Sequence, residues 1–410
     1  MSKFESAVAR MPAPFAFAAR LLPLLPLQLM LDASLREIRT RHPRIFDRLG
    51  VHTGKRFGLQ PTDLPHWNRI SRSRSMNSTA SAKASPPRSA RTARPGDDGT
   101  MAGEATSSNM QLTLGPVLFN WKPDEWRDFY YRIAEEAAVD TVVIGEIICS
   151  KRSPFLKDHM PSAVARLLAC GKQVILGSLT LMSLPRERKQ MAELADVTAL
   201  QMEVNDISVL GLLAGRPHAI GPYVNVYNEA AARYFASRGA VRICLPPELP
   251  MTSIRTIAAA LPDVTFEVFG FGRAPLAISA RCYHARLHDL TKDSCRFVCE
   301  QNPDGLAVST LDDEPFLAMN GVQTLSYACT SVLAEIDDLA AAGVGALRLS
   351  PQHCDMVAVT RVYRDVIDHK MTASEGAAEL GRIYPVPLAN GFLYARPGAN
   401  LVSDTGLHRA

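Results

Sequence analysis

The fold is decided by residues 112–146, LTLGPVLFNWKPDEWRDFYYRIAEEAAVDTVVIGE, which read as a strand, a helix and a second strand. The two ends, 112–119 and 140–146, are short and mainly apolar, as is typical of strands buried on both faces. The segment between them, 124–137, has the spacing of an amphipathic helix. Its apolar face consists of Trp126, Phe129, Tyr130, Ile133 and Ala137. This order of elements predicts a parallel sheet built from βα units.

The same alternation continues as far as residue 370. The predicted strands are 112–119, 140–146, 173–179, 199–204, 218–224, 241–246, 265–271 and 346–350. Helices are predicted over 124–137, 162–171, 228–239, 251–261 and 355–370. Eight strands alternating with helices over roughly 260 residues predict an α/β fold, a (β/α)8 barrel of the TIM type.

A long insertion, residues 272–345, separates predicted strands seven and eight and carries Cys282, Cys295 and Cys299 with the spacing C-x12-C-x3-C. A fourth thiol, Cys149, follows predicted strand two. In a barrel these four cysteines would lie on loops at the carboxyl ends of the strands, where barrel enzymes place their chemistry. Four thiolates can hold an iron–sulfur cluster or a structural zinc ion. The spacing leaves both open, together with ordinary reduced thiols.

The other four cysteines have different expected roles. Cys244 and Cys354 lie at or just after the ends of predicted strands six and eight, so they would face the same side and remain candidates. Cys170 ends a predicted helix and Cys329 lies in an irregular stretch, so both are expected to be structural.

Charged residues crowd around the candidate ligands. The basic ones are Lys151, Arg152, Arg281, Arg286, Lys292 and Arg296. Their positive charge would offset the negative charge of thiolates and sulfides. Glu146 ends predicted strand two and points the same way as Cys149. It is a candidate catalytic acid or base, or an acceptor that orients a metal ligand.

The sequence before residue 111 differs in composition from the rest of the chain. Residues 1–66 predict a short helical segment, and residues 67–110 predict a disordered basic linker, because they offer too little apolar surface to offset the entropy of ordering. Between Asn68 and Pro95 there are seven Lys or Arg residues and no Asp or Glu. The net charge of +4 therefore resides in the linker, and we expect no nucleic-acid partner. Residues 398–410 are a predicted tail.

Composition bounds the class of protein. Apolar residues at 47% and charged residues at 21% are typical of soluble globular chains. Eight cysteines without the regular pairing of a secreted scaffold predict a reducing compartment, the cytoplasm. The most apolar stretch, 13–32, is interrupted by Arg20, Pro23 and Pro26 and is too short to span a bilayer.

Several motifs together resemble the UbiV family, a group of U32 peptidase-like proteins of oxygen-independent ubiquinone biosynthesis. The motifs are LGPVLFNW (114–121), GEIICSKR (145–152), SARCYHAR (279–286), KDSCRFVC (292–299), NPDG (302–305), NGVQT (320–324) and RLSPQ (348–352). The resemblance covers residues 111–397. Residues 1–66 resemble a truncated start of UbiT, a lipid-binding factor of the SCP2 type in the same pathway.

The resemblance to UbiV implies a [4Fe-4S] cluster held by Cys149, Cys282, Cys295 and Cys299. It also implies a heterodimer with a UbiU-like paralogue that hydroxylates the ring of the quinone precursor without O2. Prephenate is a candidate oxygen donor, and a UbiT-like lipid-binding factor is a further expected partner. Two alternatives stay open: a zinc-stapled, non-enzymatic assembly protein, and a U32-type hydroxylase that acts on RNA.

Peptidase activity, which the name of the wider group suggests, is not expected. The sequence has no H-E-x-x-H motif and no G-x-S-x-G elbow. GFGR at 270–273 is half of a dinucleotide fingerprint, and it does not open a βαβ unit, so dinucleotide binding is not expected either.

Overall fold

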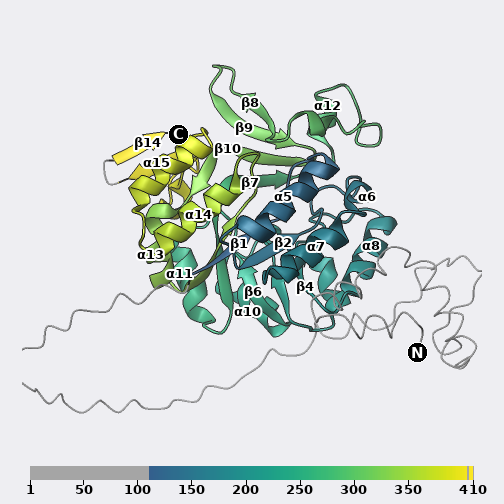
Figure 1. The fold of residues 1–410 in the computed structure, drawn as a ribbon, viewed down its shortest axis with the longest axis horizontal. Helices are drawn as coiled ribbons and strands as arrows, with labels where there is room; N and C mark the ends of the chain where they lie inside the picture. Colours follow the sequence, from purple (N-terminus) through teal and green to yellow (C-terminus); the bar gives the residue numbers. More distant parts are fainter. Residues whose placement is uncertain (1–109, 404–405, 410) are drawn as a thin grey trace, which may run out of the picture. The chain divides into compact units, whose positions relative to one another are not determined.

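The computed structural model describes residues 110–403 and 406–409, and its centre is a closed barrel of parallel strands (Figure 1). The strands are β1 (Gln111–Leu114), β2 (Thr141–Ile144), β3 (Gln173–Gly177), β4 (Gln201–Val204), β5 (His218–Ile220), β6 (Ala240–Cys244), β7 (Thr265–Ile278) and β11 (Val344–Leu349). Each strand pairs in parallel with the next, and β11 closes the barrel by pairing with both β7 and β1. The predicted (β/α)8 fold is confirmed, and every predicted strand is present.

Helices connect the strands and cover the outside of the barrel. The helices are α5 (Pro123–Glu136), α6 (Ser153–Leu156), α7 (Met160–Ala169), α8 (Pro185–Ala195), α9 (Leu210–Leu213), α10 (Glu229–Ser237), α11 (Met251–Ala260), α12 (Tyr283–Arg286), α13 (Ile336–Ala341), α14 (Met356–Ile367) and α15 (Ala373–Ile383). All five predicted helices are present. The prediction did not include α6, α8, α9, α12, α13 and α15. α8 was missed because its sequence, PRERKQMAELA, shows little apolar periodicity.

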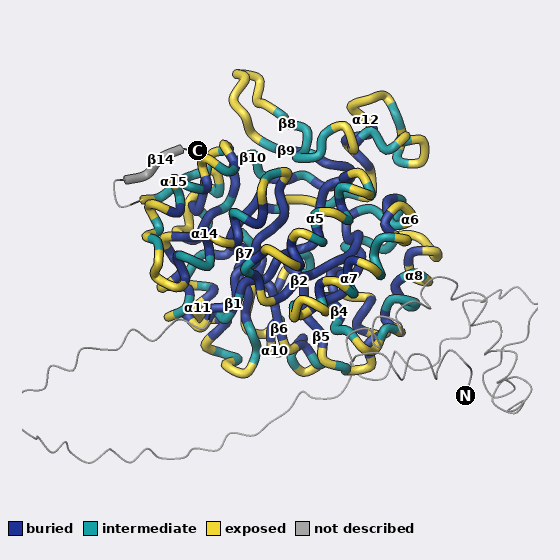
Figure 2. Tube along the Cα trace, viewed as in Figure 1, coloured by how far each residue is buried: buried dark blue, intermediate teal, exposed yellow. Residues whose placement is uncertain are grey.

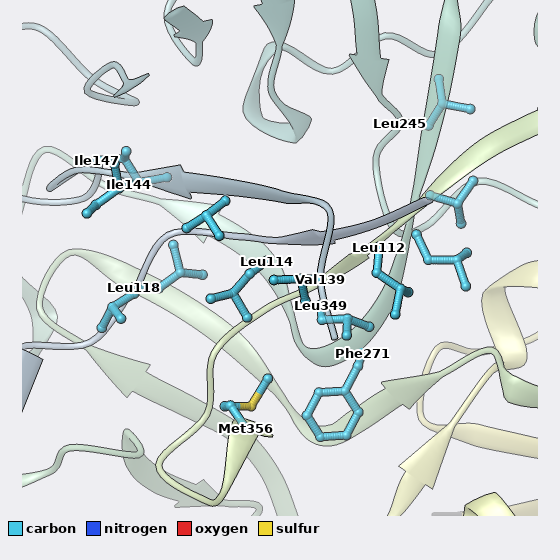
Figure 3. Close-up of a cluster of buried hydrophobic side chains, with 14 of the residues drawn as sticks. Leu112, Leu114, Leu118, Val139, Ile144, Ile147, Leu245, Phe271, Leu349 and Met356 are labelled. Carbon is cyan, nitrogen blue, oxygen red and sulfur yellow. The ribbon is translucent and has the colours of Figure 1, made fainter. Parts of the chain in front are cut away.

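The main hydrophobic core lies between the barrel and the helices. Figure 3 shows part of it, where Leu112 and Leu114 of β1 lie near Leu349 of β11. Side chains alternate along a strand, so Thr113 faces the barrel interior instead. A separate small cluster, Val143, Ile175 and Ala219, fills part of that interior.

An ion-pair network fills another part of the barrel interior. Arg348 of β11 pairs with Glu203 of β4, which lies on the opposite side of the barrel, and with Glu267 of β7. Arg242 of β6 donates to the other oxygen of Glu267 at 3.0 Å. Both carboxylates are fully buried, so each depends on these arginines for its stability as an anion.

The insertion after strand seven is more regular than predicted. β7 continues to Ile278 instead of ending near residue 271, and it pairs antiparallel with β10 (Gln323–Ser331). β9 (Pro315–Asn320) and β8 (Leu306–Ser309) extend this sheet. Figure 2 shows that the β8–β9 hairpin and the segment around α12 are largely exposed.

The structure leaves several predictions outside its described residues. The helical segment 1–66, its apolar stretch 13–32 and the linker 67–110, apart from Met110, lie there. Within the predicted tail, β13 (Asn400–Ser403) and β14 (Gly406–Arg409) form an antiparallel pair. Before the tail, the two-residue β12 (Leu388–Ala389) joins β10. In the described part of the chain, no helix has both the length and the apolarity to cross a membrane.

Candidate metal centre and the adjoining cavity

Four cysteines from three separate segments line one small pocket at the carboxyl end of β2. Cys149 follows β2, Cys282 precedes α12, and Cys295 and Cys299 lie in the next part of the insertion. Lys151, Arg152 and Lys292 are among the other residues of this pocket, which we call the thiol pocket. The fold therefore brings together the four thiols that the sequence singled out.

Local hydrogen bonds hold two of these cysteines in place. The Glu146 carboxylate accepts hydrogen bonds from the backbone N–H groups of Ile148 and Cys149, both at 2.8 Å, and so shapes the turn that carries Cys149. The Cys282 sulfur accepts from the backbone N–H of Ala285 at 3.4 Å, as a cap at the start of α12. Both sulfurs are thereby kept at the edge of the barrel.

The turn between Cys295 and Cys299 has an unusual backbone. Arg296 and Phe297 both have positive φ, 48° and 55°, a region that non-glycine residues seldom adopt and bulky ones least of all. Such conformations cost energy and persist where the surrounding structure imposes them. Their effect is to set Phe297 against the thiol pocket, with the Lys151 ammonium 5.7 Å from the ring centroid.

Hydrogen-bond donors surround the sulfurs. Arg152 is buried, and its Nη2 lies 3.5 Å from the Cys299 sulfur. Asn120 Nδ2 lies 3.4 Å from the same sulfur, and Lys151 Nζ lies 3.6 Å from that of Cys295. Donors of this kind stabilise negative charge on sulfur, as a metal-bound thiolate requires.

Burial acts on the thiols in the opposite direction. It raises the pKa of Cys149, although the nearby Arg152 lowers it in part. Burial also raises the pKa of Cys282, with Cys299 and Cys295 adding to the rise. Without a metal these two thiols therefore hold their protons, and a metal that binds them must displace the protons.

The spacing of the donors bears on the kind of metal. Four sulfurs around one zinc ion, each at 2.3 Å, would lie about 3.8 Å apart. Among the residues described here, no three His, Cys, Asp or Glu side chains are grouped closely enough to hold a single ion. In a [4Fe-4S] centre each thiolate binds a different iron, so the sulfurs stand farther apart. The four thiols that line the thiol pocket would supply one thiolate to each iron of such a cluster.

The structure separates the remaining cysteines from this pocket. Cys244 is buried within the barrel, and Cys329 is buried on β10. Cys170 is exposed at the end of α7. Cys354, which follows β11, lies against the sulfur of Met356 at 3.8 Å. Not one of these four lines the thiol pocket.

The predicted basic residues divide into three groups. Lys151, Arg152 and Lys292 line the thiol pocket, while Arg281 and Arg286 are exposed to solvent. Arg296 lines a neighbouring cavity instead.

That neighbouring cavity has a volume of about 310 Å³ and lies between the loop after β1, α6 and the turn at Phe297. Its aromatic walls are Phe119, Trp121, Trp126, Phe155 and Phe297. Glu146 and Arg152 contribute polar groups, and Arg152 and Phe297 belong to both pockets. Burial raises the pKa of Glu146, while the charge of Arg152 opposes the rise. We call this space the aromatic cavity.

Asn320 and Gly321 adjoin Arg152 at this site, although the sequence did not mark either residue individually. The Asn320 side chain accepts from Arg152 at 2.7 Å and donates to the backbone oxygen of Cys299 at 3.1 Å. A Cβ at Gly321 would collide with Arg152 Nη2. The stretch NGVQT, which contains both, was the available signal, but its role depends on contacts with residues far away in sequence.

The chain is similar to curated proteins and to a known family. The chain is 27% identical to the tRNA hydroxylation protein P of Helicobacter pylori strain J99, over 47% of this chain and 49% of that protein. It is 26% identical to the protein of the same name from strain 26695, over the same shares. The chain thus spans about half the length of these curated relatives. The family description Peptidase family U32 matches residues 129–403. The chain belongs to peptidase family U32.

Proposed function

We propose that this chain is an iron–sulfur subunit of a hydroxylase that modifies the ring of a quinone precursor without O2. The observation that carries the proposal is the convergence of Cys149, Cys282, Cys295 and Cys299 on one pocket. These four would hold a [4Fe-4S] cluster, and Arg152 would donate a hydrogen bond to one of its thiolates. A cluster bound in this way supplies one-electron transfer.

The reaction class draws support from the family. Both curated relatives are named for hydroxylation, and a U32 chain with a cavity beside its thiol pocket suits the same kind of chemistry. The quinone precursor as substrate comes from the resemblance of the motifs around the four cysteines to UbiV. The same resemblance favours a UbiU-like paralogue as partner, a UbiT-like factor that presents the lipid substrate, and prephenate as the oxygen donor.

A second candidate is hydroxylation of RNA, because the curated relatives are named for tRNA. The two candidates make different predictions for cells that lack the chain and grow without O2. Loss of ring-hydroxylated quinone with unchanged tRNA hydroxylation would support the quinone substrate. The reverse pattern, measured by mass spectrometry of both pools, would support RNA.

The metal content of the full-length chain tests the cluster. Purified without oxygen, the protein should contain about four irons and four acid-labile sulfides and absorb broadly in the visible range. Cys295→Ala should remove most of the iron, because Cys295 lines the thiol pocket. Cys170→Ala is the matched control, since Cys170 is exposed on α7. A colourless protein that contains zinc would refute the cluster and favour the zinc-stapled alternative.

A further inference from the structure

The aromatic cavity has the size and walls of a site for one flat ring. Its volume of about 310 Å³ lies at the lower end of the range for small-molecule sites. Phe155 and Phe297 meet edge to face at its rim, with ring centroids 4.8 Å apart. On the inner side, Trp126 packs on Tyr130 at 4.5 Å and is thereby held in place.

Polar atoms in the walls of this cavity lack partners. Trp126 Nε1 and Arg152 Nε have no acceptor among the described residues, but both atoms are fully buried, so a ligand in the cavity would not reach them. Glu146 uses Oε1 to accept from two backbone N–H groups, and no donor among the described residues reaches its second oxygen. The free oxygen of Glu146, a residue that lines the cavity, is therefore the polar atom to which a ligand can donate a hydrogen bond.

The turn at Phe297 joins this cavity to the thiol pocket. Phe297 adopts its strained backbone conformation, with φ of 55°, although any glycine would adopt it at lower cost. Its ring lines both pockets, as does the Arg152 side chain. A strained residue that forms a shared wall is a reason to infer function at this position.

We propose that the aromatic cavity binds a planar, single-ring molecule that carries a hydroxyl or amino group. The ring lies against Phe297 and the tryptophans, and its polar group donates a hydrogen bond to Glu146. Only Phe297 and Arg152 then separate the ring from the thiol pocket. That the bound ring is the substrate rests on the proposed function, whereas its binding rests on the cavity alone.

Phenol is the probe that tests this inference on the full-length protein. Two of the three tryptophans in the chain, Trp121 and Trp126, line the cavity, so phenol should change the tryptophan fluorescence in a saturable way, and calorimetry should give the same affinity. Cyclohexanol has the same hydroxyl on a ring of similar size that is not flat. We expect it to bind at least about 3-fold more weakly, because it cannot stack.

Two variants probe the two kinds of contact. Phe297→Ala removes one wall and should weaken phenol binding by about 3- to 10-fold. Glu146→Gln can keep the contacts of Oε1 with the backbone but replaces the free oxygen with a donor, and a similar loss is expected. Tyr234→Ala, at an exposed aromatic residue on α10, is the matched control and should leave binding unchanged.

The outcomes separate this inference from the proposed function. Cys295→Ala should lose iron and still bind phenol, because Cys295 does not line the aromatic cavity. If the wild-type protein holds no iron yet binds phenol with the expected selectivity, the binding site stands and its assignment to a substrate fails. Equal affinity for phenol and cyclohexanol, unaffected by Phe297→Ala and Glu146→Gln, would overturn the inference whatever the metal content.

Discussion

Replacing Glu267 with Gln should destabilise the barrel strongly, although the two side chains have nearly the same volume. Glu267 is fully buried inside the barrel, where its two oxygens accept hydrogen bonds from Arg348 and Arg242. Removing one partner of a buried ion pair costs about 3–5 kcal/mol, because the other charge remains buried without compensation. Arg348 keeps its contact with Glu203 in the variant. We therefore expect the free energy of unfolding to fall by about 3 kcal/mol, at the lower end of that range.

The titration of Glu267 gives a second route to the same magnitude. Burial alone would raise its pKa, but Arg348 and Arg242 outweigh burial and lower the pKa from 4.5 to about 2. A depression of that size corresponds to about 3 kcal/mol of stability at neutral pH. Because the folded pKa is the lower one, this stability is present above pH 4.5 and is lost as the pH falls towards 2.

The assay is urea unfolding of wild type, Glu267→Gln and the control Glu314→Gln, followed at pH 7 and at acidic pH. Glu314 is exposed in the loop between β8 and β9, so its variant should match wild type within about 0.5 kcal/mol. The gap between wild type and Glu267→Gln should narrow below pH 4.5. The reasoning would be refuted if Glu267→Gln lowered the free energy of unfolding by less than about 1 kcal/mol at pH 7. It would also be refuted if the difference in free energy between wild type and the variant did not depend on pH.

Three further predictions concern the thiol pocket. Gly321→Ala should lower the free energy of unfolding by about 1–3 kcal/mol, because φ is +70° and the new Cβ would meet Arg152. Gly211→Ala is the control and should leave stability unchanged, because a Cβ there meets nothing within 4 Å. Asn320→Ala should lower both stability and iron content, because it removes the acceptor that holds Arg152 at 2.7 Å; iron retained at the wild-type level would contradict this. Cys329→Ala should keep its iron, since Cys329 is buried on β10, outside the thiol pocket, and iron loss there without unfolding would argue against the ligand set.

The sequence indicated the barrel reliably because the signal is local and repeated. A strand such as 141–144 is an apolar run buried on both sides, and a helix such as α5 shows its apolar face through spacing alone. The antiparallel strands of the insertion were not predicted, because β8 alternates between half-buried and exposed residues and contains few of the large apolar side chains that mark a strand.

The candidate site also has a part that the sequence indicates and a part that only the tertiary structure shows. From the sequence, the motifs around Cys149, Cys282, Cys295 and Cys299 singled out these four thiols through their resemblance to a family, while position alone also left Cys244 and Cys354 as candidates. Only the tertiary structure decided that Arg152 contacts Cys299, that Asn320 holds Arg152, and that Phe297 divides two pockets. These contacts join segments separated by more than a hundred residues, and no local periodicity records a distance of that kind. They exist because closing the barrel brings the carboxyl ends of its strands to one face.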